Sequence, residues 1–339
     1  MSIKNSDYTR TPSFGPIAIL DEHPAWSLPL IRELEGRGLV VEKIDHSSHA
    51  FDPRERERRY SVVVNRTSPS SHTRGHRQVL FYAEALLRHY ESLGVPVINP
   101  VAAYRHEKSK ALQIDLFERL GLRYPRTVVV SHPDQVLKAA DRLRFPVVVK
   151  PNVGGSGAGI RRFADRDELA TAADTLDFGP DHTALVQEYV ESEGDAIVRV
   201  EILDGRYLYA IRIVRDREAG FNLCPADICR VPDGAPPAAD LGACPAEAPA
   251  APGFHVSGYA APAEAIDAVR RLTRAASIDV GGVEYLVGKD DGQIYYYDVN
   301  ATSNFVADAA RVVGFDPTRD FADYIVRVAT RASTALGAA

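Results

Sequence analysis

The sequence predicts an α/β protein in which a parallel α/β domain is followed by two α+β lobes. Three observations support this prediction. Short β-branched runs such as PIAIL and SVVV alternate with amphipathic segments over the first hundred residues. A second alternation then ends in a glycine-dense turn. Two later pairs of apolar runs are each joined by a glycine-containing turn, as in β-hairpins. We expect three domains, at residues 1–103, 104–186 and 187–339.

Composition is that of a folded soluble protein, because 45% of the 339 residues are hydrophobic and 25% are charged. The net charge of −6 argues against general nucleic-acid binding. No apolar run approaches the roughly 18 residues of a membrane helix. The first residues have no apolar core, and the three cysteines, Cys224, Cys229 and Cys244, do not suggest a disulfide framework or a usual zinc pattern. A cytoplasmic protein is therefore expected.

In the first domain we expect strands at 16–20, 39–44, 61–64 and 95–98, with helices at 27–36 and 76–93. Ligands of such parallel sheets lie beyond the carboxyl ends of strands. Arg66 and Arg74 lie at or just past one such end. They are candidates to clamp a substrate carboxylate, although solvated surface arginines are commoner.

In the second unit we expect a helix at 109–120, a strand at 127–130, a helix at 134–143, a strand ending at Lys150, a helix at 167–176 and a strand at 184–190. The third unit begins with a hairpin of 197–203 and 207–214, turned at Asp204-Gly205. A Pro- and Ala-rich surface loop or lid at 229–261 and a helix at 262–276 follow. Strands at 283–287 and 293–299 form a last hairpin, and a helix at 321–332 ends the fold.

The stretch FPVVVKPNVGGSGAGI joins a buried strand to a turn with four glycines. Glycine at this density lets backbone N–H groups approach phosphate oxygens, and Lys150 adds a positive charge. A plain connecting turn is the alternative. Neither G-x-x-x-x-G-K-[ST] nor G-x-G-x-x-G is present, so a nucleotide here would need another architecture.

The last hairpin carries Glu284, Asp298 and Asn300, two carboxylates and an amide oxygen that suit Mg²⁺ bearing a substrate phosphate. An odd loop, 289–291 or 288–292, would place Glu284 opposite Tyr296 and on the face of Asp298. A two-residue Asp291-Gly292 turn would place it on the other face. The magnesium hypothesis therefore predicts the odd loop.

Taken in order, these parts resemble an ATP-grasp ligase over residues 15 to 330. The resemblance rests on SKALQIDLFERLGLRYPRT with Lys110, the lysine strand and glycine loop, the segment LVQEYV, and the final D-V-N. It is greatest to the RimK-type and glutathione-synthetase-like branch. Asp298 stands where this family more often has a glutamate, one methylene longer.

The resemblance implies that ATP binds between the lysines and the hairpin. Its phosphates would contact Lys110, Lys150, Gly154, Gly155, Ser156 and Gly157. Adenine would contact Glu188, Tyr189 and Val190, with either Glu191 or Asp195 on the ribose. Two Mg²⁺ ions, with Mn²⁺ as an alternative, would be held by Glu284, Asp298 and Asn300.

The resemblance also implies the reaction: an ATP-dependent carboxylate–amine ligase that acts through an acyl phosphate. Arg212 would stabilise the transferred phosphoryl group and Asn222 would lie near it. We expect small amino-acid-like or dipeptide substrates and a homo-oligomer, a dimer or tetramer. The alternatives are a ligase that modifies a peptide or protein, as RimK-type enzymes do, and a non-catalytic nucleotide-binding protein with the same fold.

Overall fold

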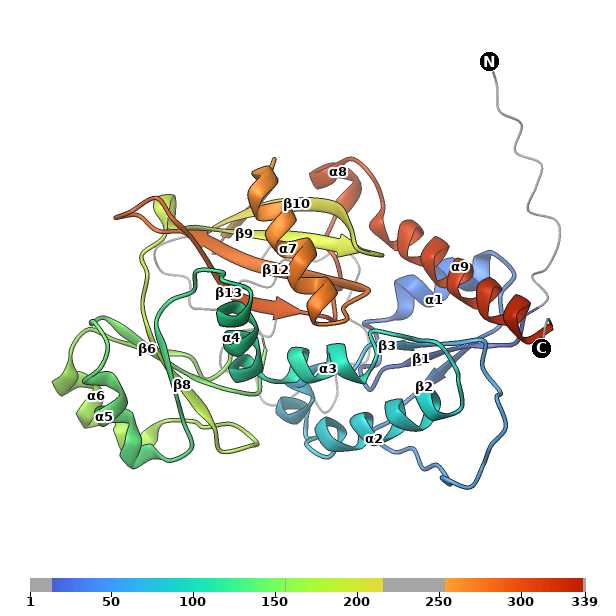
Figure 1. The fold of residues 1–339 in the computed structure, drawn as a ribbon, viewed down its shortest axis with the longest axis horizontal. Coiled ribbons are helices and arrows are strands. Elements are labelled where there is room, and N and C mark those ends of the chain that lie inside the picture. Colours follow the sequence, from blue (N-terminus) through green and yellow to red (C-terminus); the bar gives the residue numbers. More distant parts are fainter. Residues whose placement is uncertain (1–13, 156, 216–253, 338–339) are drawn as a thin grey trace, which may run out of the picture.

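The computed structural model describes residues 14–155, 157–215 and 254–337. Three sheets follow one another along the chain (Figure 1). The strand β8 (Ala184–Glu188) crosses the position 186/187 expected as a boundary, and the predicted division into domains remains a prediction. In the described ranges, every helix is too short or too polar to cross a bilayer.

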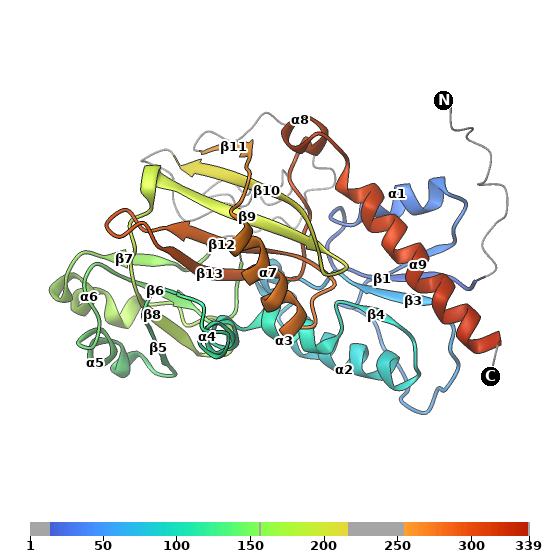
Figure 2. The same ribbon diagram turned by 45° about the horizontal axis from the view of Figure 1, so that its top comes forward.

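The first sheet is parallel, in the order β2-β1-β3-β4. Its strands are β1 (Ile17–Leu20), β2 (Val41–Ile44), β3 (Val62–Asn65) and β4 (Val97–Ile98). One face packs on α1 (Leu28–Gly36), and the other packs on α2 (Val79–Ser92). The C-terminal helix α9 (Pro317–Gly337) lies beside α1 over this sheet, as Figures 1 and 2 show. These strands and helices confirm the predicted parallel domain.

The second sheet is antiparallel, in the order β5-β8-β6-β7. Its strands are β5 (Thr127–Val130), β6 (Val147–Pro151), β7 (Arg161–Phe163) and β8 (Ala184–Glu188). The helices α5 (Val136–Ala140) and α6 (Arg166–Ala172) cover one face of this sheet. They pack on the apolar side chains of alternate strand residues, which point to that face. Both observed helices are shorter than the predicted ranges 134–143 and 167–176, because a 3-10 turn adjoins each one.

The third sheet is antiparallel, in the order β11-β10-β9-β12-β13. Its strands are β9 (Ala196–Leu203), β10 (Arg206–Arg215), β11 (Phe254–Gly258), β12 (Val280–Val287) and β13 (Ile294–Asn300). The predicted turn at Asp204-Gly205 is confirmed, since Leu203 pairs with Arg206. One face packs on α4 (Lys110–Arg119) and α7 (Ala263–Ala275).

Several elements differ from the sequence prediction. Part of the predicted loop at 229–261 is wrong, because residues 254–258 form the strand β11 against β10; residues 229–253 lie outside the described residues. The helices α3 (Val101–Lys108) and α8 (Ala309–Val313) and the strand β7 were not predicted. The helix α9 is longer than 321–332 at both ends: Pro317 stands at its start, where proline is tolerated, and its apolar residues from Phe321 to Ala329 pack in the core with α1 and β3.

Asn99 joins the first sheet to the third. It follows β4, and its side-chain oxygen accepts hydrogen bonds from the N–H groups of Asp279 and Val280 at 2.8 and 3.2 Å. Its side-chain nitrogen donates to the carbonyl of Val280 at 2.8 Å. The start of β12, one of the strands of the candidate site, is therefore fixed against the N-terminal domain.

Candidate active site

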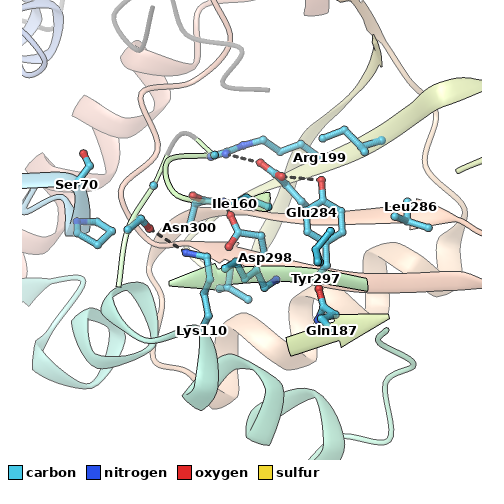
Figure 3. A pocket seen from close by; sticks show the side chains of 18 of the residues that line it. Ser70, Lys110, Ile160, Gln187, Arg199, Glu284, Leu286, Tyr297, Asp298 and Asn300 are labelled. Atoms are coloured by element: carbon cyan, nitrogen blue, oxygen red, sulfur yellow. Dashed lines mark hydrogen bonds and ion pairs between the residues drawn. The ribbon is translucent and has the colours of Figure 1, made fainter. Parts of the chain in front are cut away.

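A cavity of about 230 Å³ lies where the three units meet. The second sheet lines it with the side chains that face away from α5 and α6, namely Val148, Lys150 and Gln187. The third sheet lines it with Arg199, Glu284 and Leu286 and with the end of β13. One end is closed by residues of the N-terminal domain. Figure 3 shows Glu284 between Arg199 and Tyr297, with Asp298 and Asn300 beside them.

Two lysines line the cavity. Lys150 ends the apolar run of β6 and is only 5% exposed. Burial, together with the charge of Lys110, lowers the pKa of Lys150 to about 8. Lys110 opens α4, which Ser109 caps, and its ammonium donates to the carbonyl of Gly154 at 2.9 Å. The α4 lysine therefore reaches the glycine loop, and both cations face the carboxylates of β12 and β13.

The glycine loop is fixed at its base and lies over the cavity. Asn152 accepts hydrogen bonds from the N–H of Ala111 at 2.8 Å and the hydroxyl of Ser109 at 3.1 Å. Its amide nitrogen donates to Asp181 at 2.6 Å. At Gly155, a β-carbon would lie 3.6 Å from that of Ser70. The loop therefore reaches from the second sheet to the N-terminal domain, and Gly154, Gly155 and Gly157 line the cavity.

The register of the last hairpin differs from the prediction. Gly288 donates to the carbonyl of Gln293, so the loop 289–292 has an even number of residues, and the predicted pairing of Glu284 with Tyr296 is wrong. A β-bulge between Tyr296 and Asp298 then inserts one residue. As a result Glu284 pairs directly with Asp298. The two carboxylates share a face, as predicted, but because of the bulge and not because of an odd loop.

This bulge also explains the composition of the cavity wall. Tyr296, before the bulge, and Val299, after it, both pack in the core behind the sheet. Tyr297 and Asp298, adjacent in sequence, both line the cavity. Tyr297 donates to Glu284 at 2.9 Å, and the side-chain nitrogen of Asn300 donates to Asp298 at 3.0 Å. Burial and the charge of Asp298 raise the pKa of Glu284.

Sequence reasoning missed Arg199, the cation nearest to this acidic pair. Its guanidinium donates to Glu284 at 3.1 Å and to Glu201 at 2.6 Å. Gly282 makes room for it, since a β-carbon there would lie 2.5 Å from the Arg199 Nε. The available signal was the pattern IVRVEIL, in which Arg199 and Glu201 fall on one face of an otherwise apolar strand.

The predicted arginines do not line the cavity. Arg212 pairs with Val198 and so lies on the sheet face opposite to that of Arg199. Arg215, three residues later, does line the cavity and donates to the hydroxyl of Tyr189 at 3.1 Å. The predicted role of Arg212 therefore does not fit its position, because strand side chains alternate between faces.

Arg66 and Arg74 are likewise committed to protein groups. Arg66 is buried and donates to the carbonyl of Ser303 at 2.5 Å and to the side chain of Asn304. Arg74 pairs with Glu22 and lies over the Trp26 ring, 4.7 Å from its centre. The predicted carboxylate clamp is therefore replaced by two arginines that support the cavity wall from behind.

The segment predicted for adenine and ribose lies at the cavity in part. Glu188, Tyr189 and Val190 line it. The Glu188 carboxylate, however, accepts from the N–H and the guanidinium of Arg144 at 3.0 and 3.2 Å, on the sheet face of Val147. Glu191 and Asp195 do not line the cavity, and Glu191 pairs with Lys289. Ser192 lines it instead.

The N-terminal end of the cavity is lined by uncharged side chains, most of them aromatic or polar. These are Trp26, Ser68, Pro69, Ser70, Thr302, Asn304 and Phe305. Ser156, Asn222 and the three cysteines lie outside the described residues. Over the described part of the chain, no group of three or more His, Cys, Asp or Glu side chains is arranged to hold a metal. A metal held by Glu284, Asp298 and Asn300 therefore needs further oxygen ligands from a bound phosphate.

Residues 106–224 match the model of the RimK-like ATP-grasp domain. A probable alpha-L-glutamate ligase of Marinomonas sp. (strain MWYL1) is 29% identical over 158 residues, which are 45% of this chain and 48% of the relative. A second, from Aliivibrio fischeri (strain MJ11), is 27% identical over 197 residues, 54% of this chain and 62% of the relative. The chain thus spans less than two thirds of the length of these relatives.

Solved structures with the ATP-grasp fold match almost the whole chain. The ATP-grasp ligase PsnB, complexed with a phosphomimetic variant of its minimal precursor, Mg and ADP, has a TM-score of 0.65 at 16% identity, covering 94% of this chain and 100% of that one. The D-alanine–D-alanine ligase from Bacillus anthracis has a TM-score of 0.63 at 18% identity, covering 94% and 98%. The fold is therefore the ATP-grasp fold predicted from the sequence.

Proposed function

We propose that this chain, which belongs to the ATP-grasp superfamily and contains a RimK-like domain, is an ATP- and Mg²⁺-dependent ligase that joins a carboxylate to an amine. The observation that carries the proposal is the meeting of two distant parts of the sequence in one cavity. Lys110, Lys150 and the glycine loop form one wall, and Glu284, Asp298 and Asn300 form the other. Such a cavity has cations for a triphosphate and oxygen ligands for its metal.

The metal-binding wall fits Mg²⁺ on chemical grounds. Glu284 and Asp298 are paired carboxylates, and burial together with the charge of Asp298 raises the pKa of Glu284. A divalent cation between them would remove that repulsion. Glu284, Asp298 and Asn300 would hold one or two Mg²⁺ ions, or Mn²⁺, together with the phosphate oxygens of ATP. The ions would neutralise charge on the transferred phosphoryl group.

The nucleotide would lie along the segment Gln187–Val190. Because the Glu188 carboxylate is held by Arg144, we assign adenine recognition to the main chain of this segment rather than to that carboxylate. Ser192, which lines the cavity, is a better ribose contact than the Glu191 or Asp195 expected from the sequence. The phosphates would then extend towards Lys150, Lys110 and the glycine loop.

The reaction follows from the chemistry of a carboxylate, which is a poor electrophile. A carboxylate oxygen of the substrate attacks the γ-phosphorus of ATP, and the bond to ADP breaks. The amine then attacks the acyl carbon, loses a proton and displaces inorganic phosphate, which leaves an amide. Lys110, Lys150 and Arg199 would stabilise the charge on the phosphoryl oxygens, and the glycine loop would exclude water from the acyl phosphate.

The two substrates would enter at the end lined by Trp26, Ser70 and Asn304. Because side chains of the N-terminal domain and of the loop after β13 bound that end of the cavity, we favour small carboxylates and amines such as amino acids or dipeptides. A peptide substrate is the second candidate, because the structural neighbour PsnB is complexed with a precursor peptide. The predicted homo-oligomer remains a prediction.

The test is a screen for Mg²⁺- and ATP-dependent phosphate release with pairs of amino acids, dipeptides and longer peptides. At least one pair should release phosphate and form an amide detectable by mass spectrometry. Asp298→Asn should abolish the release, and Asp290→Asn, at an exposed position of the same hairpin, should preserve it. Tight binding of Mg·ATP with no release for any pair would favour the non-catalytic alternative.

A further inference from the structure

β13 is an edge strand, and near the proposed metal ligands its outer side is closed by side chains rather than by another strand. The N–H of Val299 donates to Gln113, and the N–H of Ala301 donates to the Glu107 carboxylate. Gln113 belongs to α4, and Glu107 lies in the last turn of α3. The two helices therefore supply the hydrogen-bond partners that a neighbouring strand would provide.

Gln113 contacts both main-chain groups of one residue. Its side-chain oxygen accepts from the Val299 N–H at 3.1 Å, and its nitrogen donates to the Val299 carbonyl at 2.9 Å. The same nitrogen donates to the carbonyl of His106 at 2.8 Å, which orients the amide. Gln113 is 1% exposed, so water does not compete with these bonds.

Val299 lies between Asp298 and Asn300, the proposed metal ligands, and pairs with Val283 on its inner side. The bulge just before Asp298 interrupts the regular ladder with β12 at this point. Next to this bulge, Asp298, Val299 and Asn300 keep their regular pairing with β12, and the hydrogen bonds from Gln113 hold the same short segment from its outer side. Lys110, which precedes Gln113 by one helical turn, is fixed by the same contact.

We propose that Gln113 is a positioning residue for the metal site: it sets the spacing of Asp298, Asn300 and Lys110 without touching substrate or metal. This inference rests on the proposed function. It assigns to α4 a second task, since the helix that carries the phosphate-binding lysine also holds the metal-binding strand in place. Groups that orient metal ligands typically change metal affinity or activity 10–100-fold when replaced.

The test uses Gln113→Met, which keeps the length and packing of the side chain and removes both hydrogen bonds to Val299. The affinity for ADP is measured by calorimetry across a Mg²⁺ series, together with the Mg²⁺ dependence of phosphate release. We expect the Mg²⁺ concentration for half-maximal effect to rise about tenfold or more in both measurements. ADP affinity without Mg²⁺ should fall by a smaller factor, because only the position of Lys110 contributes to it there.

A loss of stability alone must give a different result. Leu272→Ala removes a buried side chain from α7, in the core behind the same sheet, and serves as the matched control. It should lower the melting temperature and leave the Mg²⁺ dependence unchanged. If Gln113→Met does not fold, Gln113→Ala replaces it, because the smaller side chain lets water bond to Val299.

The outcomes separate this inference from the proposed function. If the wild-type protein needs Mg²⁺ and a folded Gln113 variant shows the same Mg²⁺ dependence, the positioning role is overturned. The proposed function is then unaffected. A wild-type protein that binds ADP equally well with and without Mg²⁺ would overturn both.

Discussion

Replacing Gly282 with alanine tests the arrangement of charges behind the metal site. The added β-carbon would lie 2.5 Å from Nε and 2.7 Å from Nη2 of Arg199, and 2.7 Å from a carboxylate oxygen of Glu201. Real β-carbons do not tolerate such distances, so the guanidinium must move. Its bonds to Glu201 at 2.6 Å and to Glu284 at 3.1 Å would be broken or strained.

The expected loss is large because all three charged groups are buried. Breaking a buried ion pair by displacing one partner costs about 3–5 kcal/mol, and we expect the free energy of unfolding to fall by that amount. Because Glu284 is a proposed metal ligand oriented by Arg199, phosphate release should also fall about 10–100-fold.

Urea unfolding and phosphate release at a series of Mg²⁺ concentrations would measure both effects. Gly36→Ala is the control: the residue ends α1, and an added β-carbon would meet no atom within 4 Å. That variant should be neutral or stabilised by up to about 1 kcal/mol, with unchanged activity. A Gly282→Ala protein as stable and active as the Gly36→Ala protein would refute the inferred role of Arg199.

Three further predictions follow from the same contacts. Burial and the charge of Lys110 lower the pKa of Lys150 to about 8, so in the ATP-free protein this lysine loses its charge above that pH. The KM for ATP should therefore rise above pH 8, approaching tenfold per pH unit, and the pH profile of Lys150→Arg should be flatter. Arg66→Ala should lower the free energy of unfolding by about 2–4 kcal/mol in urea titrations, since buried charged hydrogen bonds are lost; an unchanged stability would contradict the role given to this arginine. Trp26→Ala should raise the KM for the acid or amine about tenfold with the KM for ATP unchanged, whereas Phe81→Ala, 59% exposed and away from the cavity, should change neither.

Local patterns predicted the elements that carry the site. The run that ends at Lys150 is apolar on both faces and forms a central strand of the second sheet. The turn at Asp204-Gly205 was predictable because a two-residue loop of this composition favours a tight hairpin. The odd loop and the pairing of Glu284 with Tyr296 predicted for the last hairpin were wrong, because the loop is even. A bulge that no sequence signal marks nevertheless places Glu284 and Asp298 on one face, as a directly opposed pair.

The roles of individual charged residues were harder to predict, because they depend on which face of an element a side chain occupies. Arg212 and Arg199 lie on neighbouring strands of the same sheet, and only the second faces the cavity. Arg66 follows a parallel strand, where a substrate contact was expected, yet the loop after β13 takes up its hydrogen bonds. That loop is more than two hundred residues away in sequence, so no local pattern could indicate the contact.

The most direct test of the central claim is the affinity of a non-hydrolysable ATP analogue, measured by calorimetry with and without Mg²⁺. If the lysines and the carboxylates bind one triphosphate from opposite walls, Mg²⁺ should tighten binding to the wild-type protein at least about tenfold. Asp298→Asn should remove this gain, and Lys150→Ala should weaken binding under both conditions. Binding that depends on neither residue nor on Mg²⁺ would contradict the account.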